Sequence, residues 1–207
     1  SEEIPVSLEG NSDSFRMKLS FLPNGNCVIL PNINGRGYGF FKITEGESSG
    51  LWSVLRSSED EVLKGSLLIT LYENLRWKTI SPQGFREEML AYLPNESNSL
   101  LFSMALSYLG DCQRIFPSDS RPLEQVLWKI VTTNPVSQHR LQAFRLYRSI
   151  ADSEEAVQCL YTLWQERKAP KDCALSESDY IGLSYMLAMH LPEKADKIIA
   201  TQLSRIQ

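Results

Sequence analysis

The chain has 207 residues, of which 43% are apolar, so it can bury the core of one large domain or two small ones. Its 21 basic and 25 acidic residues give a net charge of −4, which argues against nucleic acid as a partner. No run approaches the roughly 18 consecutive apolar residues of a membrane helix, so we expect no membrane segment in this chain.

Strand-like sequence occupies the first 45 residues. Apolar residues alternate over 15–21, a turn is indicated at 23–26, and another aromatic and β-branched stretch runs over 38–43. About four short strands are too few for an independent sandwich, so this antiparallel segment is expected to pack on the helices or on a sheet outside the chain. We therefore interpret 1–45 as a partial β-sandwich segment. The chain begins at Ser1 without an initiator Met, which favours a piece of a longer or processed protein.

Residues 46–207 have the pattern of a helical-repeat domain, because apolar residues recur there at intervals of three and four. Helices of about 10 to 18 residues with short connectors are expected, and helix pairs recur loosely. The predicted fold is mainly α: a short antiparallel β segment followed by an α-solenoid-like (HEAT-like) array of antiparallel helix pairs. After a first helix around Leu51, the predicted starts lie near Ser58, Ser81, Ser97, Pro122, Ser137, Ser153, Ser176 and Pro192.

Large side chains on the later predicted helices are interpreted first as core and helix-packing residues, and only second as ligand contacts. They are Trp128, Phe144, Tyr147, Leu160, Trp164, Tyr180 and Tyr185. The four cysteines form no CxxC pair, so the sequence favours neither a metal knuckle nor a disulfide framework. We interpret all of them as small buried apolar side chains: Cys27, Cys112, Cys159 and Cys173.

The chain carries no recognisable catalytic string. Its two histidines, His139 and His190, lie far apart and neither belongs to an HExxH motif. No GxSxG elbow is present, and the GRGYG string at 35–39 lacks the strand–helix context of a phosphate-binding loop, so a tight turn is expected there. No catalytic residue and no metal ligand is predicted in this chain.

Three arginines, Arg140, Arg145 and Arg148, cluster on one predicted helix. Arg145 and Arg148 are i, i+3 neighbours, while Arg140 is displaced around the helix, so the three form a loose patch. The simplest interpretation is a solvated face. The functional alternative is that these guanidinium groups face a substrate cavity and receive a peptide carboxylate or an acidic side chain.

Two stretches carry a family resemblance. Asn34 with Gly-Phe-Phe-Lys-Ile at 39–43 resembles the N...G-[YF]-Y-R-V signature that closes the small β-sandwich of gluzincin aminopeptidases of the aminopeptidase N type, with Lys42 in place of the usual Arg. Tyr-Leu-Pro-Asn-Glu at 92–96 is similar to the family's Y-L-x-x-E-x-x-x-x-W segment, with Phe102 near the aromatic position.

The sequence between these stretches resembles the first helices of the family's C-terminal domain. The similarity lies in Trp52, Leu55 and the helix around 67–75, although Leu-Lys-Gly at 63–65 replaces the usual Asp-Arg-Ala. The resemblance places the chain after the active site of such an enzyme. The HExxH and GxMEN strings of the catalytic domain do not occur here, so no catalytic residue is transferred.

The resemblance implies a noncatalytic C-terminal region that caps the active-site cleft of a zinc aminopeptidase and shapes peptide access. The implied partners are the parent's catalytic domain in cis and the parent's peptide substrate. No cofactor is expected in this chain, while zinc is expected in the parent's catalytic domain. Compartment, substrate preference and oligomeric state are left open.

The alternative is an autonomous helical-repeat module that binds a protein or peptide on its concave face. The two hypotheses predict different surfaces. A large exposed apolar patch on the β segment and first helices indicates a missing domain, whereas a finished polar surface favours an independent module.

Overall fold

The chain is mainly helical. The computed structural model describes residues 28–31 and 39–206, and these contain nine α-helices, two short 3-10 helices and no strand. The α-helices are α1 (Glu45–Ser57), α2 (Glu61–Arg76), α3 (Pro82–Tyr92), α4 (Ser99–Ile115), α5 (Arg121–Thr133), α6 (Ser137–Ile150), α7 (Glu154–Glu166), α8 (Glu177–His190) and α9 (Ala195–Arg205). The 3-10 helices are η1 (Leu93–Asn95) and η2 (Pro192–Lys194). None of the described helices is long and apolar enough to span a membrane.

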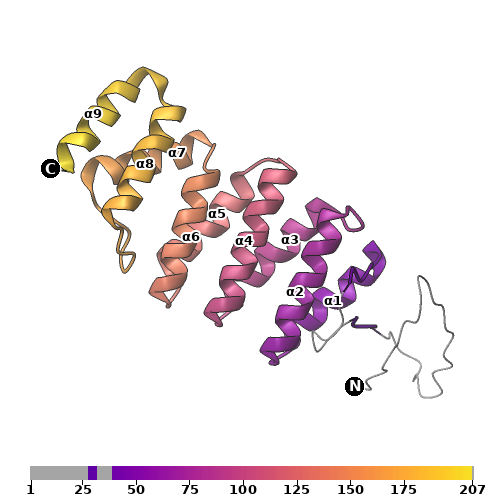
Figure 1. Cartoon of the computed structure of the whole chain (residues 1–207). Coiled ribbons are helices and arrows are strands. Elements are labelled where there is room, and N and C mark those ends of the chain that lie inside the picture. The colour runs from indigo at the N-terminus through magenta and orange to yellow at the C-terminus, as the bar shows by residue number, and fades with distance from the viewer. Residues whose placement is uncertain (1–27, 32–38, 207) are drawn as a thin grey trace, which may run out of the picture.

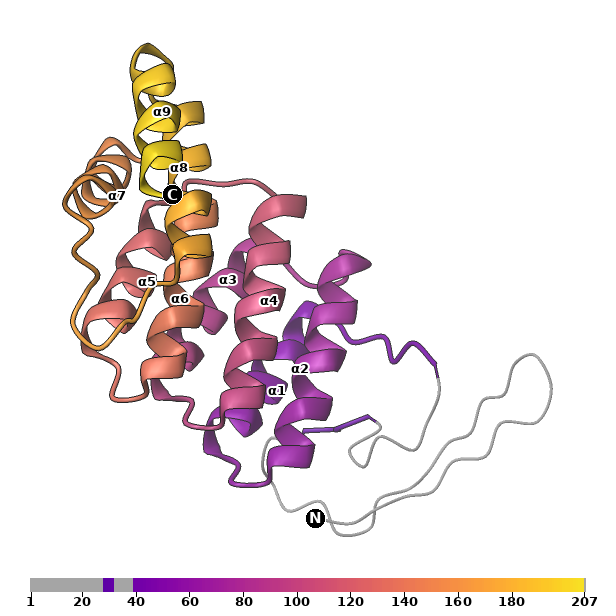
Figure 2. The same ribbon diagram turned by 60° about the vertical axis from the view of Figure 1, so that its left-hand side comes forward.

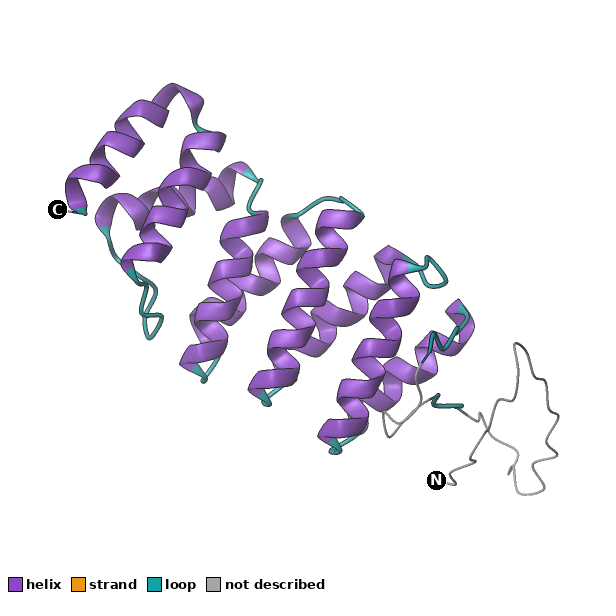
Figure 3. Cartoon of the chain, in the orientation of Figure 1, coloured by secondary structure: helices purple, strands orange, loops and turns teal. Residues whose placement is uncertain are grey.

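The helices follow one another along an elongated array. Helices α2, α4 and α6 lie side by side in one row, and α1, α3 and α5 cross behind them (Figures 1 and 3). The packing contacts agree, because α2 contacts α4, α4 contacts α6, and α6 contacts α8. At the C-terminal end α9 packs on α8 (Figure 2). Each helix therefore packs mainly against its neighbours in the chain and in the row.

The predicted β segment is described only in part. Residues 28–31 and 39–44 contain no strand, and the remainder of 1–45, with Cys27, lies outside the described residues. The helical part begins at Glu45, ahead of the predicted first helix around Leu51. The cause is a capping box that the prediction missed: the Glu47 backbone N–H donates to Oγ1 of Thr44 (3.4 Å), and the Thr44 N–H donates to Oε2 of Glu47 (2.7 Å).

Ser81, Ser153 and Ser176 cap their helices as predicted, but two caps were assigned to the wrong residue. Asp60 caps α2 instead of Ser58. Its Oδ1 accepts hydrogen bonds from Val62 N (2.9 Å) and Leu63 N (3.1 Å). Asn98 caps α4 instead of Ser97, since its Oδ1 accepts from Leu100 N (2.9 Å) and Leu101 N (3.1 Å). In both cases the cap lies one or two residues later than predicted.

The core forms one continuous cluster along the array. Five of the seven large side chains predicted in it are buried: Phe144, Tyr147, Leu160, Trp164 and Tyr180. Trp128 is half-buried, and Cys112 and Cys173 are buried while Cys159 is half-buried. The prediction for Tyr185 is wrong, because this side chain is 61% exposed on the face of α8 opposite to the buried Leu183 and Leu187.

Candidate functional site

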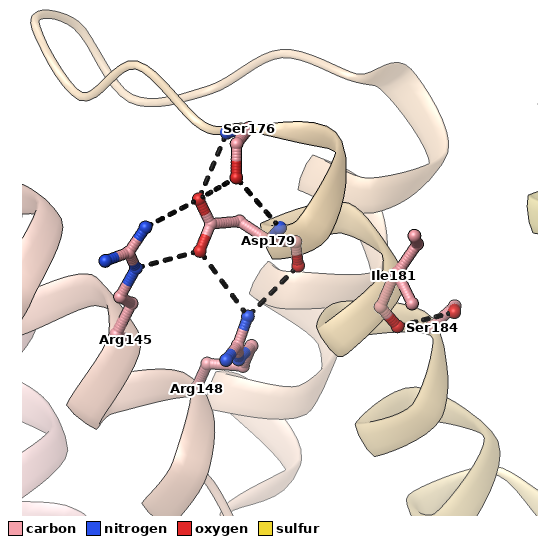
Figure 4. Close-up of polar contacts among 6 residues, drawn as sticks. All are labelled: Arg145, Arg148, Ser176, Asp179, Ile181 and Ser184. Atoms are coloured by element: carbon pink, nitrogen blue, oxygen red, sulfur yellow. Dashed lines mark hydrogen bonds and ion pairs between the residues drawn. The ribbon is translucent and has the colours of Figure 1, made fainter. Parts of the chain in front are cut away.

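The Arg145 and Arg148 side chains on α6 converge on Asp179, in the first turn of α8 (Figure 4). Arg145 donates from Nε to Oδ1 (2.9 Å) and from Nη2 to Oδ2 (3.3 Å) of Asp179. Arg148 Nη1 donates to the Asp179 carbonyl oxygen (3.1 Å), and its distance to Oδ1 is 3.8 Å. Gly182 leaves room for this contact, since a Cβ there would lie 2.5 Å from Nη1 of Arg148. The two arginines therefore join α6 to α8.

The carboxylate of Asp179 is buried and fully engaged. It also accepts from the backbone N–H (3.0 Å) and the hydroxyl (2.7 Å) of Ser176, which complete a capping box at the start of α8. Burial opposes ionisation of Asp179, but the Arg145 guanidinium and the Ser176 hydrogen bonds outweigh it and lower its pKa to about 2. Asp179 therefore remains charged and acts as the counterion of the arginine pair.

Arg140 lies apart from this pair, at the start of α6. Its Nε donates to the Asn134 carbonyl oxygen, and its Nη1 donates to the Lys171 carbonyl oxygen (2.6 Å) and lies 3.5 Å from Oδ2 of Asp172. Its side chain is largely buried by these contacts. The three arginines consequently do not form one patch, because Arg140 joins the α5–α6 and α7–α8 connectors instead.

Only Arg145 of the three lines a described hollow, which lies between α4 and α6 and has a volume of about 630 Å³. Arg114 on α4 lines the same hollow, and no sequence signal singled it out. Both guanidiniums are already paired with carboxylates of this chain, Arg114 with Asp111 (2.6 Å) and Arg145 with Asp179. The hollow therefore offers little uncompensated positive charge, and the role of Arg145 as a substrate contact stays a prediction.

A larger hollow, of about 910 Å³, lies between α2 and α4. We call it the α2–α4 hollow. Its lining includes Phe40, Phe41, Glu61, Val62, Ile69, Glu73, Asn74, Leu100, Leu101 and Met104. Val62 and Leu100 are exposed at 68% and 70%, and the apolar side chains of Ile69 and Phe40 are also exposed. The exposed ring of Trp77 extends this surface, with its centroid 5.7 Å from that of Phe40.

Asn74 fixes one wall of the α2–α4 hollow. Its side chain is fully buried on α2, where Oδ1 accepts from the Ile43 N–H (2.9 Å) and Nδ2 donates to the Phe41 carbonyl oxygen (2.8 Å). These bonds hold the segment before α1 against α2 and place the Phe40 backbone at the hollow. The polar residue that builds this wall was not predicted from the sequence, because its partners lie more than 30 positions away.

The segment at 92–96 that carries the family resemblance forms a buried polar cluster. The Glu96 carboxylate accepts from the Tyr92 hydroxyl and from the Asn98 N–H (2.7 Å), and it forms an ion pair with Lys64 of α2. Burial opposes ionisation of Glu96, but Lys64 and Tyr92 outweigh it and lower its pKa. Burial and the neighbouring Glu96 raise the pKa of Tyr92. This cluster fastens the α3–α4 connector to α2 and presents no exposed nucleophile.

His139 is fully buried at the start of α6. Its ring stacks on Phe102 (centroids 4.0 Å apart, planes at 6°), and its Nε2 shares a hydrogen bond of 3.0 Å with Oγ of Ser99. Nδ1 has no hydrogen-bond partner among the residues that the structure describes. Burial lowers the pKa of this imidazole, although Glu96 opposes that shift. His190 is exposed, and the described part of the chain contains no group of three or more His, Cys, Asp or Glu side chains able to hold a metal ion.

Comparisons with protein-family models, with curated proteins and with solved structures found no match to this chain.

Proposed function

We propose that this chain is the noncatalytic C-terminal region of a zinc-dependent aminopeptidase of the aminopeptidase N type. In this proposal the helices cap the active-site cleft of the parent enzyme and shape peptide access. The motifs at 39–43 and 92–96, in that order along the chain, support it. Zinc and the catalytic residues belong to the parent's catalytic domain, which contacts this region in cis, and a peptide is the parent's substrate.

The observation that carries the proposal is the apolar surface at the N-terminal end of the array. Exposed apolar side chains gather there around one hollow, on the segment before α1, on α2 and the residue after it, and on α4: Phe40, Val62, Ile69, Trp77 and Leu100. Clustered apolar exposure of this kind marks a contact surface. It supports contact with a further domain, as a cap on a catalytic domain requires.

The proposal includes a HEAT-like solenoid built from the pairs α1–α2, α3–α4, α5–α6 and α7–α8. Contacts between each helix and its immediate neighbours support this arrangement, since a solenoid is stabilised mainly by nearest-neighbour interfaces. A continuous helical wall over a cleft can exclude bulk water and limit the length of the peptide that fits.

The alternative is an autonomous helical-repeat module that binds a protein or peptide. The hollow between α4 and α6 favours it, because its two arginines are neutralised within the chain and Ser103, Ser107 and Ser149 also line it. A surface of this kind requires no covering domain. The proposal therefore requires a further domain at the N-terminal end of the array, whereas the alternative does not.

An aminopeptidase assay distinguishes them. A panel of aminoacyl fluorogenic substrates with added zinc is given to the 207-residue chain and to its full-length parent. Turnover by the parent alone supports the proposal, and a parent shortened by the helical region should lose its discrimination between short and long peptides. An inactive parent favours the module, and zinc-dependent turnover by the 207-residue chain contradicts both candidates.

A further inference from the structure

We propose that the α2–α4 hollow receives a short extended segment of the neighbouring domain that carries apolar side chains and a lysine or arginine. The inference rests on the proposed function for the source of this segment. The chemistry of the segment follows from the residues that line the hollow. Three features of the hollow restrict the segment that can bind there: its apolar wall, the carboxylates of Glu61 and Glu73, and its length.

The apolar wall requires apolar side chains in the occupant. Val62 and Ile69 are seven residues apart on one face of α2, which places them about 10 Å apart along the helix axis. Leu100 of α4 lies across the hollow from them, and the buried Leu101 also contributes to the lining. Covering the exposed members removes apolar surface from water, which is the main favourable contribution to such a contact.

The charges of the lining select a basic occupant. Glu61 and Glu73 line the hollow, whereas no Lys, Arg or His is found among its lining residues in the part of the chain that the structure describes. Glu73 is 3.7 Å from Arg76, in an exposed pair of the kind that contributes little stability. No ion pair engages Glu61 within the described part of the chain. A lysine or arginine beside Glu61 therefore gains a carboxylate partner, while an acidic side chain there is repelled.

The length of the hollow fits a segment of about five or six residues. Glu61 and Glu73 are twelve positions apart, about 18 Å along α2, and an extended chain advances roughly 3.3 Å per residue. The wall formed by Phe40 and Phe41 is held in place by Asn74 before any partner arrives. A preformed wall reduces the entropy that is lost on binding.

The first test uses blocked hexapeptides, N-acetylated and C-amidated, titrated into the 207-residue chain by calorimetry at low salt. The probe alternates Leu and Lys. One matched peptide replaces Lys with Glu, and the other replaces Leu with Ser. We expect saturable binding of the Leu–Lys peptide that is at least tenfold tighter than binding of either matched peptide. Equal affinities, or no saturable binding of the Leu–Lys peptide at millimolar concentration, would overturn the proposal.

The second test locates the binding. Ile69→Ser and Glu61→Gln change exposed side chains of the α2–α4 hollow, and Met189→Ser changes an exposed apolar side chain on α8 as a control. Ile69→Ser should weaken binding of the Leu–Lys peptide at least fivefold, and Glu61→Gln should reduce its preference over the Leu–Glu peptide. Circular dichroism establishes that each variant is folded.

An equal loss of affinity in Met189→Ser would identify general apolar adhesion and overturn the proposed site. The aminopeptidase assay on the parent stands apart from these titrations. An active parent with no peptide binding here overturns the docking proposal alone, whereas peptide binding here with an inactive parent overturns the proposed source of the segment and the proposed function.

Discussion

At the scale of single residues, Asp179 is a buried carboxylate that joins two helices. Its carboxylate is almost completely removed from water and serves two arginines of another helix, of which Arg148 is itself largely buried. A buried charge is tolerated only where it is paired and hydrogen-bonded. Removing this carboxylate charge leaves the Arg148 guanidinium without its counterion.

Asp179→Asn should lower the free energy of unfolding by roughly 2 to 3 kcal/mol. Urea denaturation monitored by circular dichroism measures this loss. The matched control is Asp172→Asn, because Asp172 is a more exposed partner of an arginine and should change stability little. Equal midpoints for Asp179→Asn and the unsubstituted chain would show that the buried charge is not required.

The same carboxylate should make the protein sensitive to acid. The folded pKa of Asp179, about 2, lies below its ordinary value of 3.8, so its contribution is present above pH 4 and is lost as the pH falls from about 4 towards 2. The difference corresponds to roughly 2 kcal/mol. Unfolding free energies measured across this range should fall less in Asp179→Asn than in the unsubstituted chain, and parallel curves would contradict the assignment.

His139 adds a separate dependence on pH. Because burial lowers the pKa of the folded imidazole, the unfolded chain binds a proton first, and stability should decrease as the pH falls below about 6.5. His139→Phe keeps a ring against Phe102 and should remove this dependence between pH 7.5 and 5.5. The chain has only one other histidine, the exposed His190, so His190→Gln is the control and should leave the dependence unchanged.

At the scale of elements, helix starts depend on which polar side chain reaches the free N–H groups. For α4 the sequence offers Ser97 and Asn98 next to each other, and only the structure places the Asn98 side chain on the first turn. Asn98→Ala should therefore lower the free energy of unfolding by about 1 kcal/mol. Ser97→Ala, at the exposed neighbouring position, should change the free energy of unfolding little. Thermal or urea denaturation measures both losses, and a larger loss in Ser97→Ala than in Asn98→Ala would identify Ser97 as the cap.

At the scale of the whole molecule, the helices could be predicted from the sequence, but the surfaces between them could not. The spacing of apolar residues predicted the helical part, since that pattern is local to each helix. The α2–α4 hollow combines residues near 40, 62 and 100, and the Arg145–Asp179 pair spans 34 positions. Such contacts depend on how helices pack in register, which local patterns do not encode. For the same reason Tyr185 was assigned to the core, although the surface of α8 that carries it is exposed.

The arrangement in neighbouring pairs also predicts how the molecule unfolds. Trp164 of α7 is buried and donates from Nε1 to Oε1 of Gln202 on α9 (2.8 Å), so Trp164→Ala should remove a contact that joins the C-terminal helices, at a cost of about 3 to 5 kcal/mol. Because each helix contacts mainly its neighbours, hydrogen exchange should accelerate in α7, α8 and α9 while the amides of α1 to α4 remain protected. The control Gln158→Ala, at an exposed position on the same helix, should leave both regions protected. Uniform acceleration along the whole chain in Trp164→Ala would instead indicate one cooperative unit, in which the C-terminal helices and the α2–α4 hollow are lost together.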